Sequence, residues 1–296
     1  MKEQPLVSVV IPTYNRASII TEPLKSVLNQ TYQNIEVIVV DDGSADNTEE
    51  VVRQIGDDRI RYVRTENRGA CAARNTGMEM AKGEIISFHD SDDILLPEKI
   101  ATQLEALETH GADIVLCKHY NIENGNRDTS SKHIKEGFME VPDIHGVGTF
   151  AILGRRDAIL STRFDIRLPR FQDFDYLIRV AQNHSVYMVD KPLVEHELSE
   201  NSISWSVKRY YQASRILLAK ERKLLRQLPV SKRILSDMAI DFAKNLPLKQ
   251  YLFRVKLVRI SLGYDSNIQN IRRGLSTLTG FYSLRESLKK ILGVTN

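Results

Sequence analysis

Short apolar runs alternate with helix-spaced apolar patterns through the first half of this 296-residue chain. Residues 6–11 and 35–40 are apolar runs of strand length, and between them Ile20, Leu24 and Leu28 recur on one helix face. A strand, a helix and a strand in this order form a βαβ unit with a right-handed crossover. Further strands are predicted at residues 60–63, 85–88 and 114–117. The pattern predicts an α/β fold with a mostly parallel sheet flanked by helices.

Acidic residues close two of these apolar runs. Asp41 and Asp42 follow residues 35–40, and Asp90-Ser91-Asp92-Asp93 follows residues 85–88. Parallel strands end at a common edge of the sheet, and ligands of open α/β proteins bind outside that edge. Carboxylates gathered there suit a divalent cation and a phosphorylated substrate.

Weaker local signals mark the remaining elements. Asp46 followed by Glu49 predicts a capping box, and Pro97 predicts the first turn of a helix after the acidic cluster. Residues 123–148 are polar and contain several glycines, which we interpret as loop and edge strand. A helix is predicted from residue 173 to residue 183, and one more short strand after it.

Composition is that of an ordinary globular protein, with 42% hydrophobic and 27% charged residues, and it excludes collagen-like, disordered and multi-span membrane classes. The two cysteines, Cys71 and Cys117, lack C-x-x-C spacing, so neither a disulfide framework nor a zinc site is indicated. The N-terminal apolar run is too short for a signal peptide, and no run is long enough to span a membrane. We therefore expect a cytoplasmic protein.

The net charge of +3 conceals an asymmetry along the chain. Residues 206–296 hold 19 Lys and Arg against 5 Asp and Glu, a net +14, which leaves a net −11 for residues 1–205. We expect a domain over residues 1–205 and a basic helical region over 206–296. The basic region could meet an anionic membrane leaflet or nucleic acid, or could be a solvated face of basic helices. It shows no zinc-finger spacing or RNA-binding signature, so we expect no nucleic acid.

Two nucleotide-binding loops are excluded by the sequence. Ile11 is followed by Pro12-Thr13-Tyr14-Asn15-Arg16 without a glycine, which rules out the phosphate loop of a dinucleotide-binding dehydrogenase. The chain also contains no P-loop motif.

Asp-x-Asp occurs twice, as Asp90/Asp92 and as Asp173/Asp175. The first pair directly follows a predicted strand, where Mg²⁺ or Mn²⁺ could bridge the carboxylates to a diphosphate. The second pair opens a predicted helix, where an acidic residue can simply favour the positive helix end.

A set of motifs follows in a fixed order along roughly residues 5–205. The segments are Val9-Val10-Ile11-Pro12-Thr13-Tyr14-Asn15-Arg16, Val39-Val40-Asp41-Asp42-Gly43-Ser44, Asn67-Arg68-Gly69, Ala73-Arg74-Asn75-Thr76-Gly77, Asp90-Ser91-Asp92-Asp93, Gln172-Asp173-Phe174-Asp175-Tyr176 and His196 with Asn201-Ser202-Ile203-Ser204. This order of motifs resembles the family 2 glycosyltransferases of GT-A fold, a Rossmann-like architecture.

The resemblance implies a site for a nucleotide sugar. Tyr14 would stack on the nucleobase, Asp42 would accept the pyrimidine N3 proton and so select uracil, Arg74 would reach the uridine, and Asp90 would contact the ribose. Asp42 could instead be a turn residue before Gly43. Arg74 could instead pair with a neighbouring acid. The full set of implied nucleotide-sugar contacts is Pro12, Thr13, Tyr14, Asn15, Asp41, Asp42, Arg74, Asp90 and Ser91.

The resemblance also implies the metal ligand and the catalytic base. Asp92 would bind Mn²⁺ or Mg²⁺, which neutralises charge on the leaving diphosphate, with Asp93 behind it. Asp173 would take the proton from an acceptor hydroxyl, and direct displacement would invert the anomeric configuration. Asp175 and His196 are further candidates.

The chain departs from the commoner family pattern beside two of these residues. Gln172 stands where many members carry Glu, which removes one charge next to Asp173. Glu195 stands where many members have a more basic neighbour of His196, which weakens a diphosphate role for that histidine. His89 beside Asp90 is interpreted as a strand residue facing the other side of the sheet.

We therefore predict a cytoplasmic, inverting, metal-dependent glycosyltransferase of hexosyl or N-acetylhexosaminyl type. It would move a sugar from a UDP-sugar to a saccharide or a lipid-linked saccharide, in bacterial surface polysaccharide synthesis, and its basic region could bind the inner face of the membrane peripherally. Two alternatives stay open: a polyprenyl-phosphate sugar synthase with the same nucleotide site, and a non-catalytic nucleotide-sugar-binding protein.

Overall fold

The computed structural model describes residues 4–123, 125–129, 134–139, 144 and 147–197, together with residues 209, 212, 213, 216, 217 and 220. The chain divides into two compact units, residues 1–217 and 218–296, and all of the second unit except Lys220 lies outside the described residues. The predicted boundary between residues 205 and 206 stays a prediction.

One sheet carries the described part of the chain, in the order β3-β2-β1-β4-β9-β6-β10-β5, with β7 added to β6 and β8 to β10. The strands are β1 (Val7–Thr13), β2 (Ile35–Asp41), β3 (Ile60–Arg64), β4 (Ile85–Phe88), β5 (Ile94–Leu95), β6 (Ile114–Glu123), β7 (Asn126–Thr129), β8 (Gly137–Phe138), β9 (Leu153–Arg155) and β10 (Val186–Glu197). The helices are α1 (Thr21–Leu28), α2 (Thr48–Gln54), α3 (Ala70–Met80), α4 (Lys99–His110), α5 (Arg156–Leu160) and α6 (Gln172–Val180), with a 3-10 turn, η2, at Thr149–Ala151.

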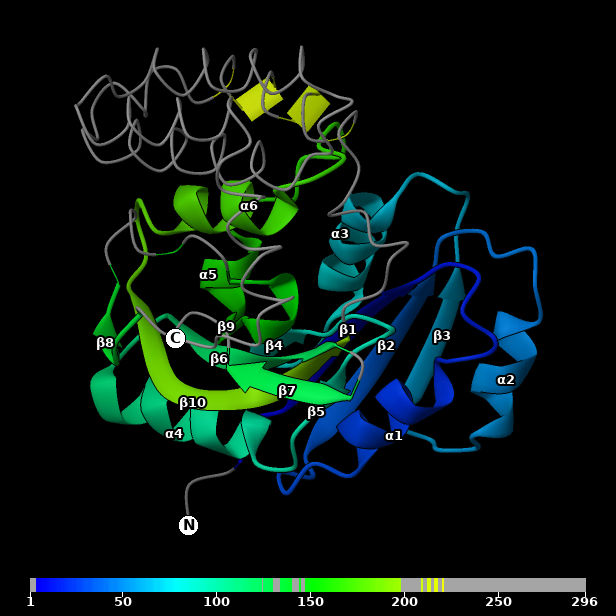
Figure 1. Cartoon of the computed structure of the whole chain (residues 1–296), viewed down its shortest axis with the longest axis horizontal. Coiled ribbons are helices and arrows are strands. Elements are labelled where there is room, and N and C mark those ends of the chain that lie inside the picture. Colours follow the sequence, from blue (N-terminus) through cyan, green and yellow to red (C-terminus); the bar gives the residue numbers. More distant parts are fainter. Residues whose placement is uncertain are drawn as a thin grey trace, which may run out of the picture. The chain divides into compact units, whose positions relative to one another are not determined.

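The first four strands form the predicted parallel sheet. β1 lies between β2 and β4 and is parallel to both, with Val7 opposite Ile35 on one side and Ile85 on the other. Helices cover both faces, with α3, α5 and α6 above the sheet in Figure 1 and α1 and α4 below it. Every residue of β1 and β2 is therefore buried, which explains why these strands read as continuous apolar runs. The prediction of an α/β fold with a mostly parallel sheet is confirmed.

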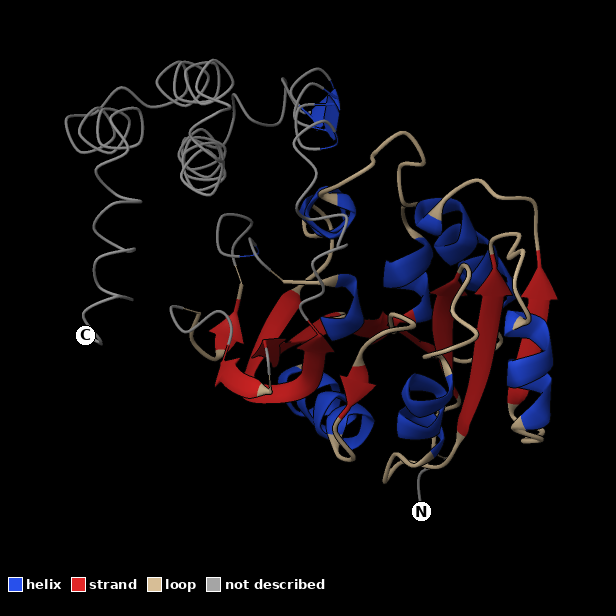
Figure 2. Cartoon of the chain, turned by 45° about the vertical axis from the view of Figure 1, so that its right-hand side comes forward, coloured by secondary structure: helices blue, strands red, loops and turns tan. Residues whose placement is uncertain are grey.

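The other half of the sheet is mixed. The three-residue strand β9 lies between β4 and β6 and is antiparallel to both, and β5 is antiparallel to β10. The short strand predicted after the last helix extends over twelve residues as β10, because it follows β6 in parallel through register shifts at Pro192 and Glu195. Figure 2 shows the resulting curve of this half of the sheet.

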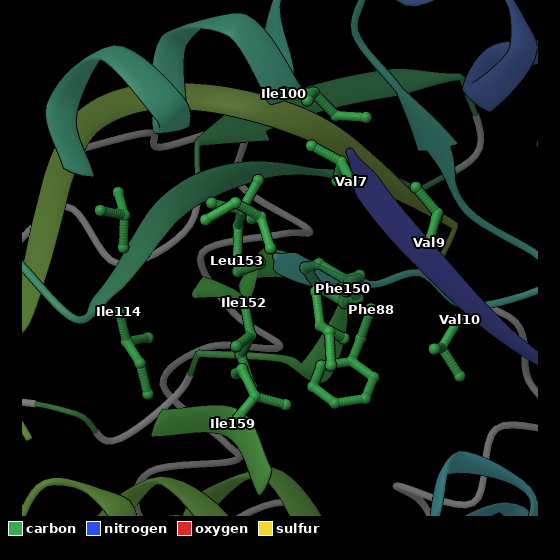
Figure 3. Close-up of a cluster of buried hydrophobic side chains, with 14 of the residues drawn as sticks. Val7, Val9, Val10, Phe88, Ile100, Ile114, Phe150, Ile152, Leu153 and Ile159 are labelled. Carbon is green, nitrogen blue, oxygen red and sulfur yellow. The ribbon is translucent and has the colours of Figure 1, made fainter. Parts of the chain in front are cut away.

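Aromatic side chains join the sheet to α6. The ring of Phe164 stacks on Tyr176 with centroids 4.2 Å apart, and both rings meet Phe88 of β4 edge-on. The Tyr176 hydroxyl donates a hydrogen bond to the carbonyl of Ile159, 2.7 Å away. Figure 3 shows Phe88 and Ile159 in the surrounding apolar core, with Phe150 beside them. This packing fixes α6 above the end of β4.

Two local predictions are wrong. Helix α2 begins at Thr48 and makes no capping box, because the Asp46 carboxylate accepts the N–H groups of Ala17 and Thr48 while Glu49 pairs with Arg53. Pro97 lies two residues before α4, which begins at Lys99, so it ends the loop after β5 and is not in the first helical turn.

The first unit includes residues beyond position 205. Ala213 and Leu217 are buried against Leu168, with Phe171 and Ile216 beside them. Leu168 and Phe171 belong to the turn that leads into α6. In the part of the chain that the structure describes, no helix has the length and apolar character that crossing a membrane requires.

Candidate active site

The loop after β1 is held against the loop after β2. The Asn15 N–H donates to Ser44 Oγ at 2.8 Å, and the Ala45 N–H donates to Asn15 Oδ1 at 2.8 Å. Asn15 has a φ of 50°, a left-handed conformation that asparagine tolerates better than most residues. Tyr14 is 46% exposed, so a rigid loop presents its aromatic ring to solvent. Such a ring can stack on a planar base.

Pro12 and Thr13 frame this loop from inside the sheet. Pro12 is buried and lies opposite Val40 in the β1–β2 ladder. The Thr13 carbonyl accepts the N–H of Asp42 at 2.9 Å, and the buried Thr13 hydroxyl has no hydrogen-bond partner in the described part of the chain. Both residues therefore set the position of Tyr14 and Asp42.

Asp41 and Asp42 are adjacent but point to different surroundings. Asp41 is fully buried, and its carboxylate accepts the Ser44 N–H at 2.7 Å and the hydroxyl of Tyr62. It therefore braces the turn from within, and its predicted contact with the nucleotide is untested.

The Asp42 carboxylate faces the beginning of α3. It accepts the N–H groups of Arg68 and Gly69 at 2.8 and 2.7 Å. Each carboxylate oxygen can accept a second hydrogen bond, so the group keeps capacity for a ligand donor. Gly43 enables the turn, since its φ is 79° and an added Cβ would lie 3.0 Å from the Asn67 nitrogen. The turn role and the predicted base contact are thus compatible.

Arg74 links the end of β4 to the start of α6. From the buried face of α3, its Nη2 donates to Asp90 Oδ1 at 2.6 Å and its Nη1 donates to Gln172 Oε1 at 3.0 Å. Thr149 of η2 donates its hydroxyl to Asp90 at 3.1 Å. Burial acts to raise the pKa of Asp90, but the charge and hydrogen bond of Arg74 hold it below its usual value. Asp90 is thus an oriented, ionised carboxylate.

Asp92 is the most exposed carboxylate of this cluster. Its Oδ2 lies 3.1 Å from Nη2 of Arg16, and its side chain is 39% exposed. Partial burial and the charge of Asp90 raise the pKa of Asp92, and Arg16 opposes that rise. Ser91, between Asp90 and Asp92, is buried.

Asp93 is buried behind Asp92 and pairs with His196 of β10. Asp93 Oδ1 lies 2.7 Å from His196 Nδ1, while Asp93 Oδ2 has no hydrogen-bond partner among the described residues. Burial raises the pKa of Asp93 to about 7. Burial acts to lower the pKa of His196, but the hydrogen bond and charge of Asp93 raise it. The net shift of the His196 pKa is upward. The ring of His196 stacks on Phe150, 5.0 Å away.

Asp173 lies in the first turn of α6, next to the Arg74–Gln172 contact. Its Oδ1 accepts the N–H of Phe174 at 2.8 Å. Burial raises the pKa of Asp173, and the charge of Asp90 adds to that rise while Arg74 opposes it. A carboxylate with a raised pKa is a stronger base, which suits proton abstraction near neutral pH.

Asp175 and His89 are not part of this group. Asp175 is buried and accepts two hydrogen bonds from Arg179 on its own helix, at 3.1 and 2.7 Å. His89 is fully buried after β4, and burial lowers its pKa to about 3, so the ring is neutral at physiological pH. Both side chains are components of the fold.

The sequence profile described as Glycosyl transferase family 2 matches residues 8–162. The chain belongs to this family. An uncharacterized glycosyltransferase of Rickettsia typhi is 30% identical over 267 residues, which is 83% of each chain. Glycosyltransferase GlyG of Streptococcus pneumoniae is 42% identical over 124 residues, 41% of each chain, so this match spans less than half of that relative.

Solved structures show the same fold. The 1–349 fragment of S. aureus TarS in complex with UDP-GlcNAc has a TM-score of 0.61 at 18% identity and covers 96% of this chain and 91% of that one. The mannosyltransferase PcManGT from Pyrobaculum calidifontis, in complex with GDP-Man and Mn²⁺, has a TM-score of 0.59 at 18% identity, covering 99% and 89%. These likenesses confirm the GT-A architecture.

The family 2 fold implies a divalent cation, and the residues at the end of β4 fit one. No described group of three or more His, Cys, Asp and Glu side chains is arranged as a complete metal cage. A cage is unnecessary, because Mg²⁺ and similar ions are held by one or two carboxylates together with substrate phosphates. Asp92 offers a half-exposed carboxylate, and the unpartnered oxygen of Asp93 lies buried behind it.

Three residues of this candidate site were missing from the sequence-based set. Arg16 ends the loop motif, and only its distance from Asp92 in space shows its partner. Thr149 and Phe150 directly follow the segment interpreted as loop and edge strand, and no periodicity marks them. No sequence signal short of the fold itself identifies these three contacts.

Proposed function

We propose that this family 2 member is an inverting glycosyltransferase that uses a UDP-sugar and a divalent cation. The observation that carries the proposal is the double contact of Arg74, which holds Asp90 with one nitrogen and Gln172 with another. Through it the predicted donor side is tied to the first turn of α6, where the predicted base Asp173 follows Gln172 in the chain.

The donor nucleotide would bind between the loops after β1 and β2. Tyr14 would stack on the base, Asp42 would accept the N3 proton of uracil, and Asp90 would accept a ribose hydroxyl. The position of Asp42 supports uracil, because a carboxylate accepts from N3–H of uracil and would face an acceptor at N3 of cytosine. TarS, a structural neighbour, is described in complex with UDP and with UDP-GlcNAc.

Asp92 would hold the cation, with Asp93 behind it. The bound ion would neutralise negative charge on the leaving diphosphate. The chain itself contributes a cluster of carboxylates after β4, in which Arg74 holds Asp90 and His196 holds Asp93. Mn²⁺ and Mg²⁺ both prefer such oxygen ligands, and PcManGT is described with Mn²⁺.

Asp173 would accept the proton of the acceptor hydroxyl as that oxygen attacks the anomeric carbon. The bond to the UDP oxygen breaks in the same displacement, so the configuration inverts and UDP leaves. The acceptor would be a saccharide or a lipid-linked saccharide, and the transferred group a hexosyl or N-acetylhexosaminyl residue. Surface polysaccharide synthesis is the setting we propose.

A UDP-sugar panel tests this function. Wild type would release UDP from at least one UDP-sugar in a reaction that requires Mn²⁺ or Mg²⁺, and Asp92→Ala would remove most of that turnover. Turnover that persists in Asp92→Ala, or without divalent cations, would overturn the metal assignment. Failure of UDP with Mn²⁺ to raise the melting temperature would contradict a UDP-sugar site.

Asp173→Asn separates the hydroxyl acceptor from the polyprenyl-phosphate alternative. A phosphate acceptor is already ionised and needs no base, so transfer to it would survive the substitution. Transfer to a hydroxyl would fall by roughly 10²–10⁴-fold, the usual contribution of a general base.

Membrane association of the basic region is a separate proposal, and nearly all of residues 206–296 lie outside the described residues. Its charge supports contact with anionic lipid. Full-length protein would sediment with anionic vesicles at low salt and be released at high salt. Equal sedimentation with neutral and anionic vesicles would contradict the proposal.

A further inference from the structure

Each of the three carboxylates that follow β4 has its own basic partner from a different element. The pairs are Asp90 with Arg74, Asp93 with His196, and Asp92 with Arg16. In the first two pairs at least one side chain is almost fully buried. In the third, Arg16 is 41% and Asp92 39% exposed. The Arg16–Asp92 ion pair is therefore the one of the three that solvent or a ligand can most readily replace.

The backbone of Arg16 is firmly anchored. Its N–H donates to Thr48 Oγ1 at 3.0 Å, and its carbonyl accepts the N–H groups of Ile19 and Ile20 at 3.0 and 2.9 Å. The next residue, Ala17, donates its N–H to Asp46 at 3.1 Å. The guanidinium can therefore move by rotation of the Arg16 side chain alone. The backbone of Arg16 stays in place next to the predicted nucleotide loop.

A cation on Asp92 would compete directly with Arg16. The guanidinium nitrogen lies 3.1 Å from Asp92 Oδ2, on the carboxylate that we assign to the metal. A divalent ion and a guanidinium repel each other, and both need the same carboxylate charge. The nearest new anion for a displaced guanidinium would be the diphosphate that the same ion binds, and arginine matches phosphate oxygens with two parallel N–H groups.

We propose that Arg16 is a positioning residue that holds Asp92 before the donor binds and moves to the donor diphosphate when a divalent cation takes Asp92. The proposal rests on the proposed function of this site. It implies that the cation alone binds weakly, because it must displace Arg16. It also implies that UDP and the cation strengthen each other's binding, because the diphosphate receives the displaced arginine.

Binding measurements on the full-length protein test this role without turnover. Free Mn²⁺ would be followed by electron paramagnetic resonance, with and without UDP, and UDP binding by calorimetry at saturating Mn²⁺. Arg16→Gln would bind Mn²⁺ alone roughly two- to fivefold more tightly, the fold-change expected for loss of an exposed ion pair. The same variant would bind UDP at saturating Mn²⁺ about tenfold or more weakly, as for loss of a charge-assisted hydrogen bond.

Arg163→Gln is the matched control, since it removes an exposed arginine paired with Glu79, outside the acidic cluster. It should leave both affinities unchanged. Unchanged or weaker binding of Mn²⁺ alone by Arg16→Gln would overturn the competition, and unchanged UDP affinity would overturn the move to the diphosphate. Failure of wild type to bind UDP with Mn²⁺ would instead overturn the proposed function, and this proposal with it.

Discussion

Arg74 on α3 and Gln172 on α6 are 98 residues apart in the chain and are joined by a 3.0 Å hydrogen bond. Gln172 in turn donates to the carbonyl of Leu168 at 2.9 Å, in the turn before α6. A neutral amide at position 172 leaves the charge of Arg74 to Asp90 and adds no negative charge beside Asp173. The chain thus has a neutral residue in place of the commoner glutamate at a position next to the Arg74 guanidinium and the Asp173 carboxylate.

The first prediction follows from that amide. Gln172→Glu adds a carboxylate next to Asp173, whose pKa burial and Asp90 already raise. Because the base works in its ionised form, the acidic limb of kcat/KM should move to higher pH in the variant. Gln182→Glu makes the same chemical change just beyond α6 and should leave the limb in place. An acidic limb of the kcat/KM profile that is unchanged or moves to lower pH in Gln172→Glu would contradict the role assigned to the neutral amide of Gln172.

A second prediction concerns base selection by Asp42. Replacing it with asparagine removes a charged acceptor, so affinity for UDP should fall by about 10- to 100-fold. The amide of asparagine can donate to N3 of cytosine, so the preference for UDP over CDP should shrink. Calorimetry with both nucleotides measures this directly. Equal losses for UDP and CDP would show that Asp42 shapes the turn and does not read the base.

A third prediction tests the contact between residues 213–217 and the turn before Asp173. Leu217 is buried against Leu168, so Leu217→Ala should loosen the turn that positions α6. Buried Leu→Ala changes cost about 2–5 kcal/mol of packing. UDP-sugar turnover should therefore fall while UDP affinity is kept, because Asp42 and Tyr14 lie on other loops.

Leu160→Ala serves as the comparison, since that side chain is 38% exposed. It should change neither turnover nor UDP affinity. Parallel losses of turnover and UDP affinity in Leu217→Ala would indicate general unfolding and contradict a local effect.

A fourth prediction concerns Lys99, which is buried at the start of α4 and donates to Ser87 Oγ at 3.2 Å. Burial lowers the pKa of Lys99 from 10.5 to about 8. Between those pH values the unfolded state binds the proton more tightly, so the free energy of unfolding should rise with pH, by an amount on the order of 3 kcal/mol. Below pH 8, Lys99 should not contribute to the dependence of the free energy of unfolding on pH.

Lys99→Met isolates that contribution from the other groups that titrate above pH 8. Urea unfolding of the variant should show a higher stability at pH 7 and a shallower rise between pH 8 and pH 10.5. Parallel pH profiles for the variant and wild type would contradict a lowered pKa at Lys99.

The sequence predicted the elements whose patterns are local. β1, β2 and β4 were foreseen because strands covered on both faces are continuous apolar runs. The placement of Asp90 and its neighbours at a strand end followed from the same runs. The capping box at Asp46 failed because the carboxylate also bonds the distant Ala17.

Contacts between distant segments could not be foreseen in the same way. β9 has three residues, too few for any period, and its place between β4 and β6 is decided by tertiary packing. The partners of Asp90 and Asp92 include Thr149 and Arg16, which are 59 and 76 residues away. The carboxylates of the candidate site could be predicted from the sequence, but the residues that orient them can be identified only from the fold.

The stereochemistry of transfer tests the central claim most directly. With a UDP-α-sugar that the enzyme accepts, proton NMR of the first-formed product should show the β anomer, because Asp173 assists one direct displacement at the anomeric carbon. Asp173→Asn should suppress formation of that product while UDP binding is kept. A first-formed α anomer, or undiminished transfer to a hydroxyl in Asp173→Asn, would contradict the account.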